Sequence, residues 1–443
     1  MIRGQSMTSI RSNRVVVPVF FDTYDKPERH QVSIGRKRCG AGSVDVADLD
    51  LMEVGMKNAV IVDAIRTPGG KRNGQLRDWH PASLSALVLN QLVARNSVNP
   101  RDVDDVIMGC VIQFGEQSAN IARSSVLAAG WPESVPGTTV DRQCGSSQQA
   151  MHFAAQGVMA GIYDVVIAAG VESMTRVPMG SSAGTTEPIW PPEEIARYQD
   201  SGLPHQGIGA EMIAEEFGIT RDDLDRFSLE SQRRASFATE SGFFENEIVP
   251  VPVQTDRDVQ WLTRDEGIRP ETTLEGLGSL KPAFKEGGMI TAGNSSQICD
   301  GASAVLIMSE DYAKEHGLRP RARFNGFAVT GADPVTMLKG PIPATKKILE
   351  RSGLRLEDMD VIEINEAFAS VVLAWQKEFD ADLTRVNPNG GAIALGHPLG
   401  SSGTKLMATM LNELERRHGR FALQLMCEGG GMANATIIER VAS

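Results

Sequence analysis

The chain has 443 residues, which is long for a single hydrophobic core and predicts two or three domains. Its composition, with 41% hydrophobic residues and 44 glycines, is typical of a compact α/β protein and not of a fibrous or disordered one. The formal net charge of −12 argues against a general nucleic-acid binder, which needs a basic face. An anionic ligand must therefore be held by local positive groups or by helix N-termini.

The cysteine pattern indicates a reducing compartment. Five cysteines are scattered along the chain without a CxxC pair: Cys39, Cys110, Cys144, Cys299 and Cys427. This spacing fits neither a disulfide framework nor a zinc site, so we expect a cytoplasmic protein without a bound metal. No uninterrupted apolar stretch approaches the roughly 20 residues needed to span a bilayer, so no membrane insertion is expected.

Residues 1–55 show little periodicity and need separate treatment. Their first part carries arginines among serines and no acid before Asp22, which faintly resembles a mitochondrial presequence. The favoured interpretation is a disordered extension, or an upstream start ahead of a true start at Met52 or Met56.

From Met56 onward, strand and helix patterns alternate. In chain order they predict a strand at 59–62, a helix at 83–94, a strand at 106–108, a helix at 120–129, a helix at 150–159 and a strand at 164–168. Short apolar runs between helices favour parallel pairing with right-handed crossovers.

The alternation lapses between about residues 174 and 295. This stretch contains a loop rich in glycine, serine and proline at 180–192 and a charged helix at 222–237, and it reads as an inserted domain. A strand at 304–308 restores the alternation. Each half also has a glycine-flanked helix start with a reactive side chain, followed by an apolar strand that ends in glycine. This faint repeat supports a duplicated α/β core.

Four short segments carry chemical groups, and the first contains Cys144. In the segment 140–147 this cysteine lies where an apolar helical pattern begins. The unpaired N–H groups and positive dipole of a helix N-terminus stabilise a thiolate and lower its pKa. The alternative for Cys144 is a small buried core residue.

The other three segments are ambiguous alone and informative together. Asn365, in 365–368, reads by itself as a helix cap followed by an acid in the first turn. His397 lies among five glycines, where the backbone can approach a ligand closely. Cys427 ends an apolar run and precedes three glycines whose N–H groups can face an oxyanion. Two cysteines, a histidine and an asparagine in such turns of one α/β chain make a much stronger case for a reactive site together than any one segment does.

From Met56 to its C-terminus the sequence resembles the thiolase family. The resemblance rests on the four segments and on further blocks at 62–68, 291–296 and 300–302, all in the family's order. It implies a cysteine-dependent acyltransferase that makes or breaks a carbon–carbon bond between two coenzyme A thioesters. Coenzyme A is then a substrate, and no cofactor is implied.

The resemblance also implies the fold and its domains. We expect an α/β protein with the duplicated thiolase fold, a five-layered α/β/α/β/α core with an inserted loop domain. The N-terminal core domain would comprise residues 56–173 and 296–322, and the C-terminal core domain residues 323–443. Residues 174–295 would form the loop domain that covers coenzyme A, and Ser296 matches the position that contacts its pantetheine arm.

Residue roles follow from the same resemblance. Cys144 matches the nucleophile that accepts the acyl group, and His397 matches the histidine that activates it and helps to hold the substrate thioester oxygen. Asn365 matches the residue that fixes a water in that first oxyanion hole. Cys427 matches the acid/base that moves a proton at the α-carbon. The backbone N–H groups of Cys144 and Gly429 match the second oxyanion hole. Claisen chemistry needs such a set of groups.

Two departures bear on the subtype. Biosynthetic, acetoacetyl-forming members carry a histidine where this chain has Met179, which favours the degradative group acting on longer 3-oxoacyl chains. Residues 432–435 replace the usual small residues and glycine beside the active-site glycines. The stretches 71–74 and 115–118 are similar to those of bacterial thiolases that shorten bulky or branched acyl chains, including sterol side chains.

Three alternatives stay open at this point. A biosynthetic acetyl-CoA C-acetyltransferase would differ in direction and chain length. A decarboxylating ketoacyl synthase would need a second histidine in place of Asn365. A non-catalytic lipid-binding or scaffold relative would be expected to lack Cys144, His397 or Cys427, and all three are present. The expected partners are acyl-CoA and coenzyme A, in a homodimer or homotetramer, with no nucleic acid.

Overall fold

The computed structural model describes residues 56–183, 190–198, 202–255 and 258–441. The expectations about the extension 1–55 lie outside these residues. The N-terminal half comprises β1 (Ala59–Arg66), β2 (Gly70–Lys71), α1 (Pro81–Arg95), β3 (Asp105–Gly109), α2 (Ile121–Ala128), β4 (Thr138–Val140), α3 (Ser146–Met159), β5 (Val165–Ser173), β8 (Cys299–Ser309) and α8 (Glu310–Glu315).

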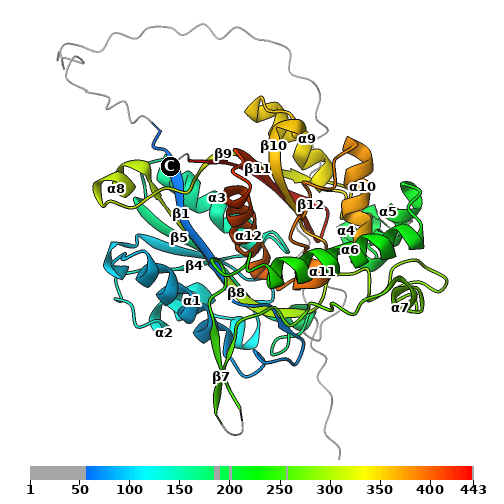
Figure 1. Ribbon diagram of the computed structural model, residues 1–443, viewed down its shortest axis with the longest axis horizontal. Coiled ribbons are helices and arrows are strands. Elements are labelled where there is room, and N and C mark those ends of the chain that lie inside the picture. The colour runs from blue at the N-terminus through cyan, green and yellow to red at the C-terminus, as the bar shows by residue number, and fades with distance from the viewer. Residues whose placement is uncertain (1–55, 184–189, 199–201, 256–257, 442–443) are drawn as a thin grey trace, which may run out of the picture. The chain divides into compact units, whose positions relative to one another are not determined.

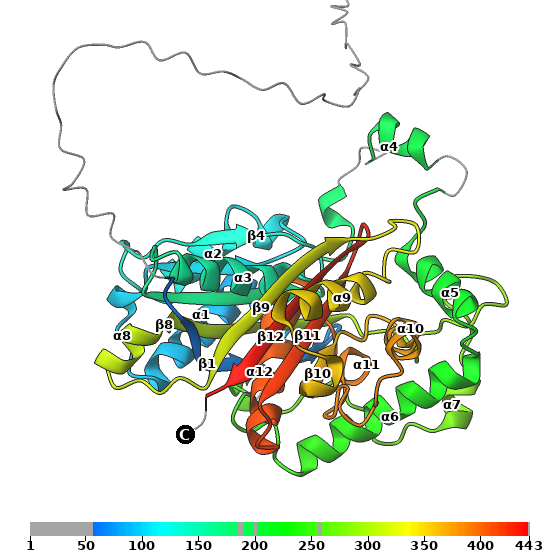
Figure 2. The same cartoon turned by 90° about the horizontal axis from the view of Figure 1, so that it is seen from above.

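The C-terminal half follows without interruption. It comprises β9 (Ala322–Gly331), α9 (Pro341–Ser352), β10 (Met359–Ile364), α10 (Ala369–Phe379), α11 (Ala392–Leu395), α12 (Ser402–Arg416), β11 (Phe421–Glu428) and β12 (Met432–Arg440). Between β5 and β8 lie α4 (Pro192–Arg197), α5 (Gln206–Glu216), α6 (Arg221–Glu240), the hairpin β6 (Val251–Gln254) and β7 (Val259–Leu262), and α7 (Leu274–Gly278). The helices α5 and α6 pack against α10 of the C-terminal half (Figure 2).

One large sheet runs through both halves in the order β10-β11-β12-β9-β1-β8-β5-β3-β4, with β2 paired to β8. Only β10–β11, β3–β4 and β3–β5 pair in parallel, and the other pairs are antiparallel. The expectation of mainly parallel pairing is therefore wrong. One reason is that β11 and β12 are consecutive strands joined by the short turn of residues 429–431, and such a hairpin is antiparallel.

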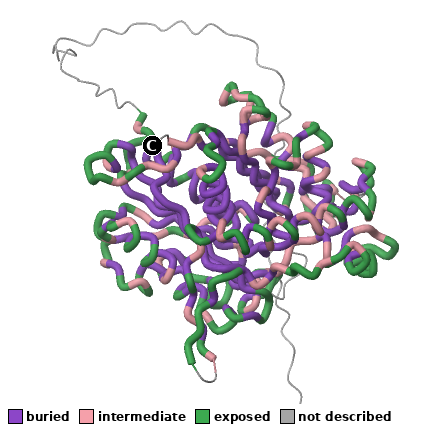
Figure 3. Tube along the Cα trace, viewed as in Figure 1, coloured by how far each residue is buried: buried purple, intermediate pink, exposed green. Residues whose placement is uncertain are grey.

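The helices cover the sheet in layers (Figure 1). The central helices α3 and α12 pack together between the two halves of the sheet, and their apolar residues share one cluster with strands of both halves. On the outer faces, α1 and α2 cover the N-terminal strands, and α9 and α10 cover the C-terminal strands. This α/β/α/β/α order confirms the expected layering. Buried positions follow the strands and the central helices (Figure 3).

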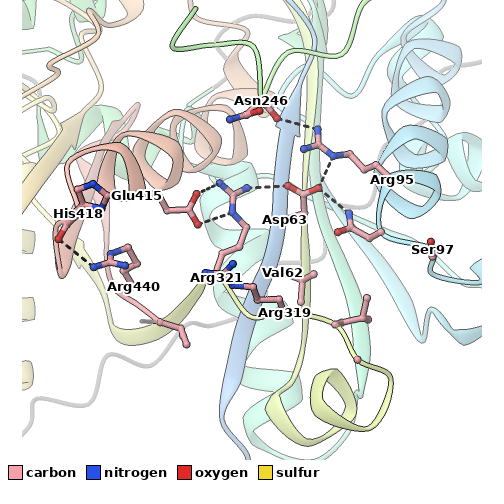
Figure 4. Close-up of a pocket in the computed structure, with 14 residues that line it drawn as sticks. Val62, Asp63, Arg95, Ser97, Asn246, Arg319, Arg321, Glu415, His418 and Arg440 are labelled. Atoms are coloured by element: carbon pink, nitrogen blue, oxygen red, sulfur yellow. Dashed lines mark hydrogen bonds and ion pairs between the residues drawn. The ribbon is translucent and has the colours of Figure 1, made fainter. Parts of the chain in front are cut away.

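The halves of the sheet meet at β1 and β9, which share only two paired positions. Just beyond this short pairing, Arg321 donates to Asp63 at 3.1 Å and to Glu415 of α12 at 2.6 Å. Asp63 is buried and also accepts from Arg95 at 2.9 Å and from Asn96 at 2.8 Å. Figure 4 shows these side chains lining a cavity of about 670 Å³ at the junction. The polar network replaces strand pairing where β1 and β9 separate.

Candidate active site

Cys144 lies in the turn between β4 and α3. The helix begins at Ser146 with Gly145 as its N-cap, so the cysteine lies one residue before the N-cap, close to the helix start that the sequence predicts. The turn is tightly packed: a methyl group on Gly145 would lie 1.9 Å from Oε1 of Glu428 and 2.5 Å from Oδ1 of Asn434. A larger residue next to the nucleophile candidate would therefore displace the buried side chains of Glu428 and Asn434.

The environment of Cys144 combines burial with directed N–H groups. Burial raises the pKa of the thiol well above its usual value, and the nearby Cys427 and Glu428 raise it further. The backbone N–H groups of Gly429 and of Cys144 itself act in the opposite direction and favour the thiolate. The expectation that the helix start lowers the pKa of Cys144 is wrong, because burial raises this pKa by more than the two N–H donors lower it. Cys144 therefore needs a base to become a nucleophile.

His397 is oriented by a serine on the next turn. Its Nδ1 lies 2.5 Å from Oγ of Ser402, and that hydroxyl donates its own proton to the carbonyl of Pro398 at 2.8 Å. The serine oxygen must then accept from Nδ1–H, which leaves Nε2 unprotonated in the neutral ring. Burial lowers the pKa of His397 to about 3, and Lys405 contributes to this, so the imidazole is neutral near pH 7.

The backbone of the His397 turn is fixed by two features. Gly396 has a φ of 79°, and a methyl group there would lie 2.6 Å from Sγ of Cys299. The ammonium group of Lys405, buried on α12, donates to the carbonyls of Leu395 at 2.6 Å and Gly396 at 2.9 Å. The sequence analysis missed Lys405 and Ser402. Their signal was a charged and a polar residue on the buried side of an apolar helical pattern.

Asn365 follows β10 directly and is not a helix cap. The helix α10 begins only at Ala369 with Phe368 as its N-cap, so the cap interpretation is wrong. Its backbone N–H donates to Leu425 of the parallel neighbour β11 at 3.0 Å, which brings Asn365 beside the end of that strand. The side-chain Nδ2 lies 3.4 Å from Nε2 of His397. The amide and the imidazole therefore meet at the edge of the sheet.

Cys427 lies in β11, one residue before its end, and is fully buried. Burial raises the pKa of its thiol to about 12; the Asn365 side chain and the Ala367 N–H oppose this shift, and Glu428 adds to it. The structure therefore brings Cys427, Asn365 and His397 together, and the electrostatic coupling of Cys427 to Cys144 completes the cluster.

A cavity of about 640 Å³ reaches this cluster at His397. Ser296 and Met179 also line this His397 cavity. Cys144, Asn365 and Cys427 do not line it. Met174 and Leu399 line the cavity and pack in one apolar cluster with Cys144, so the nucleophile candidate lies just beneath its wall.

Two buried glutamates of the site were missed by the sequence analysis as functional groups. Glu172 accepts from the N–H groups of Val111 at 2.9 Å, Ile112 at 3.1 Å and Gly400 at 2.8 Å, and so joins the end of β5 to the loop after β3 and to the turn that follows His397. Glu428 is buried without a hydrogen-bond partner for either carboxylate oxygen. Burial raises its pKa to about 9, Arg142 opposes the shift and Asp141 adds to it. Glu428 is therefore neutral near pH 7.

Within the described ranges, no group of three or more His, Cys, Asp or Glu side chains could hold a metal ion. None of the helices in these ranges is both long enough and apolar enough to cross a membrane. What the site offers is a buried thiol with N–H groups directed at it, a neutral imidazole with an unprotonated Nε2 beside the Asn365 amide, and a second thiol. A duplicated α/β core that holds these groups at the ends of its strands defines a cysteine-dependent acyltransferase.

Comparison with known proteins identifies the family. Residues 59–311 match the thiolase N-terminal domain and residues 318–440 match the thiolase C-terminal domain. The chain is 52% identical over 393 residues to a steroid 3-ketoacyl-CoA thiolase of Mycobacterium tuberculosis, covering 87% of this chain and 95% of that protein. It is 46% identical over 401 residues to a 3-oxoadipyl-CoA/3-oxo-5,6-dehydrosuberyl-CoA thiolase of Escherichia coli, covering 87% and 100%. This protein belongs to the thiolase family.

Solved structures of related enzymes have the same fold as this chain. The crystal structure of the Bacillus anthracis acetyl-CoA acetyltransferase superposes with a TM-score of 0.80 at 39% identity, covering 87% of this chain and all of that one. Human mitochondrial 3-ketoacyl-CoA thiolase gives a TM-score of 0.79 at 39% identity, with coverage of 87% and 99%. The expected family, fold, acyltransferase activity and degradative branch are thereby confirmed.

Proposed function

We propose that this protein cleaves 3-oxoacyl-CoA with coenzyme A through an acyl group on Cys144, releasing acetyl-CoA and a shortened acyl-CoA. The observation that carries the mechanism is the grouping of two coupled thiols with a neutral His397 whose Nε2 is unprotonated and accepts from Asn365. Names of relatives support the substrate class, since they include 3-ketoacyl-CoA and steroid 3-ketoacyl-CoA thiolases.

The first half-reaction breaks the carbon–carbon bond. His397 Nε2 takes the proton of Cys144, and the thiolate attacks the 3-oxo carbon. The N–H groups of Cys144 and Gly429 hold the resulting oxyanion. When the C2–C3 bond breaks, its electron pair forms the enolate of acetyl-CoA. The enolate oxygen is held by the newly protonated Nε2 and by Asn365 with a water, and Cys427 gives its proton to C2.

The second half-reaction releases the acyl group. The Cys427 thiolate takes the proton of the incoming coenzyme A, whose sulfur attacks the acyl group on Cys144. The Cys144 thiolate leaves and recovers its proton from His397. Both cysteines are thereby restored, and no external oxidant or reductant is consumed.

Further proposals concern the domains and the assembly. Residues 174–295 act as the domain that covers coenzyme A, supported by His205, Phe284 and Arg269, which line the His397 cavity from this stretch. Ser296 at the cavity wall contacts the pantetheine arm. Residues 56–173 with 296–322, and 323–443, are the two core domains. We further propose that the protein is cytoplasmic, needs no cofactor and forms a homodimer or homotetramer. Size-exclusion chromatography with light scattering tests the oligomeric state.

Chain length tests the degradative assignment. Met179 is 45% exposed and lines the His397 cavity, where it offers a flexible apolar surface to a hydrocarbon chain. Each buried methylene contributes up to roughly 0.8 kcal/mol, so a few carbons shift specificity by tens-fold. We expect thiolysis of 3-oxoacyl-CoA with six or more carbons to exceed that of acetoacetyl-CoA in kcat/KM, and Met179→His to narrow the difference. A clear preference for acetoacetyl-CoA would instead favour the biosynthetic alternative. If Cys144 is not acylated, the result would favour the non-catalytic alternative.

A further inference from the structure

The turn that carries Cys144 packs on a group of buried polar atoms without partners. Both carboxyl oxygens of Glu428, Oδ1 of Asn434 and Nε of Arg142 are buried, and none of them forms a hydrogen bond within the described ranges. The large majority of buried polar atoms in folded proteins are paired, so such a group beside the nucleophile candidate is unusual. Asn434 also belongs to the segment 432–435, which departs from the small residues and glycine usual in the family.

Glu428 and Asn434 meet at the residue that follows Cys144. A methyl group on Gly145 would lie 1.9 Å from Oε1 of Glu428 and 2.5 Å from Oδ1 of Asn434, so the two oxygens are neighbours. The amide of Asn434 is oriented by its Nδ2, which donates to Oε1 of Gln149 on α3 at 3.1 Å and leaves Oδ1 toward the carboxyl group. Two acceptor oxygens repel each other unless one of them carries a proton, and here only the carboxyl group can carry it.

The charged and titratable groups around this pair leave the carboxyl group neutral. Arg142 favours the ionised form and Asp141 the neutral form, but burial outweighs both and raises the pKa of Glu428 to about 9. His152 lies 3.5 Å from the Asn434 amide, and burial together with Arg142 lowers its pKa to about 3, so its ring carries no charge near pH 7. Near pH 7, Glu428 therefore holds a proton that it can donate to Asn434.

A charge on Glu428 would act on both thiols of the site. An ionised Glu428 raises the pKa of Cys144 and of Cys427, because a carboxylate and a thiolate repel each other when both are buried. Cys144 must lose its proton to attack the substrate, so this repulsion makes it a poorer nucleophile.

We propose that Glu428 is a positioning residue for the nucleophile. Its protonated carboxyl group donates to Oδ1 of Asn434 and so holds the turn of Cys144 and Gly145 against β12, and its ionisation weakens Cys144 as a nucleophile. A small rotation of the carboxyl group joins the two oxygens through this proton. The proton stays on Glu428 throughout thiolysis, and Glu428 touches neither the substrate nor a reacting atom. This inference rests on the proposed thiolysis.

The rate of Cys144 acylation as a function of pH tests the role of Glu428. We compare the wild type with Glu428→Gln, which keeps a donor of similar shape but cannot ionise, and follow the mass of the Cys144 peptide after rapid mixing with a 3-oxoacyl-CoA. The ratio of the variant rate to the wild-type rate should rise by about tenfold from pH 7 to pH 10, which is the effect of about one unit in the pKa of Cys144. This ratio cancels the titration of the substrate. A ratio that does not change with pH would overturn the inference.

Asn434→Leu removes the acceptor and gives a second, independent measurement. Because the proposed role is to position Cys144 and not to bind substrate, this variant should lower kcat by about tenfold at pH 7 and leave the KM for acyl-CoA within about twofold of the wild type. The matched control is Thr436→Val on the same strand, because the buried hydroxyl of Thr436 is bonded to Gln148 and His152 instead. The control should leave kcat within about twofold and the pH dependence of acylation as in the wild type.

The remaining outcomes separate this inference from the proposed function. If Asn434→Leu and Thr436→Val lower kcat and the unfolding temperature by equal amounts, the buried polar atoms only stabilise the fold and the inference is wrong. An unchanged kcat in Asn434→Leu overturns it as well, whether or not Glu428→Gln folds. If the wild type is not acylated at Cys144 at any pH, the proposed function itself fails.

Discussion

Cys144 and Cys427 are both buried thiols with raised pKa values, but their neighbours differ. Cys144 is close to its own backbone N–H and to that of Gly429 in the glycine turn, whereas Cys427 is close to the side-chain amide of Asn365. The first environment stabilises an attacking sulfur and a developing oxyanion. The second holds a thiol beside the place where a carbanion would form. We therefore expect the two cysteines to be separable by mutation.

Cys144→Ala should abolish both acylation and turnover, because no other group forms the covalent intermediate. Cys427→Ala should lower carbon–carbon cleavage by about 10²–10⁴-fold, the usual loss for a missing acid/base, while acyl exchange at Cys144 continues. The readouts are the mass of the Cys144 peptide after incubation with acyl-CoA and the rate of thiolysis. Equal loss of exchange and cleavage in Cys427→Ala would assign that residue a structural role.

Glu428 gives the site a measurable dependence on pH. Its pKa is about 9 in the folded protein against an ordinary value of 4.5, so the folded state binds a proton that the unfolded state has lost between these pH values. The contribution of Glu428 to stability is therefore fully present below pH 4.5 and declines as the pH rises to about 9. Glu428→Gln removes this decline.

We expect the unfolding temperature of Glu428→Gln to exceed that of the wild type by an amount that grows from pH 5 to pH 9. The difference in unfolding free energy should reach the order of a few kcal/mol at pH 8. Thermal unfolding of both proteins across this range measures it, and the pairwise difference cancels the other titrating groups. A difference independent of pH would show that Glu428 is ionised or solvated in the folded protein.

At the scale of the residue, the sequence predicts four candidate reacting groups but not the residues that support them. Glycine-rich turns around reactive side chains are rare and match a family in order, and they single out Cys144, His397, Asn365 and Cys427. Ser402, which fixes the tautomer of His397, was missed, because a polar residue on the buried side of a helical pattern does not show which group it contacts. The burial that raises the pKa of Cys144 is likewise a property of the packed halves and not of one segment.

At the scale of the element, periodicity predicted the positions of helices and strands better than it predicted the direction in which strands pair. The helix α1 and the strands β1, β3 and β5 lie where the apolar patterns place them. Strand direction depends on which strands become neighbours, and that is decided by long-range packing. The strand β8 follows a long insertion and then pairs antiparallel with both β1 and β5, an arrangement that no local pattern encodes.

Among these elements, the junction of β1 and β9 gives the clearest prediction for the free energy of unfolding. Asp63→Asn leaves the guanidinium groups of Arg321 and Arg95 without their shared buried carboxylate. We expect the free energy of unfolding to fall by about 1.5–3 kcal/mol, the range for a buried hydrogen bond to a charged group. Urea unfolding measures the change.

A matched control is Lys57→Met, which breaks the exposed pair with Asp164. Such a surface pair contributes at most about 1 kcal/mol, so its loss should be much smaller. If the two substitutions destabilise the protein equally, the junction network does not join the halves more strongly than an ordinary surface ion pair.

At the scale of the whole molecule, the two halves supply different groups to the proposed active site. Cys144 comes from the N-terminal half, whereas Asn365, His397 and Cys427 come from the C-terminal half, and α3 and α12 pack together between them. A faint repeat in the sequence predicted a duplicated core. The resemblance to the thiolase family predicted the order of the α and β layers. That Lys71, Arg72 and Arg269 together line the His397 cavity could not be predicted, because Lys71 and Arg269 are far apart in the chain.

The described fold begins at Met56, and the family match begins at residue 59 with β1. Since β1 lies inside the sheet between β8 and β9, the whole of this strand must be kept for folding. A protein that starts at Met56 retains β1 and every described contact, so it should match the full chain in unfolding temperature and in kcat/KM. A protein that starts at Thr67 lacks β1 and should be insoluble or unfolded. Circular dichroism and thiolysis assays compare the three proteins. Lower solubility or activity of the protein that starts at Met56 would show that residues 1–55 support the core or its assembly.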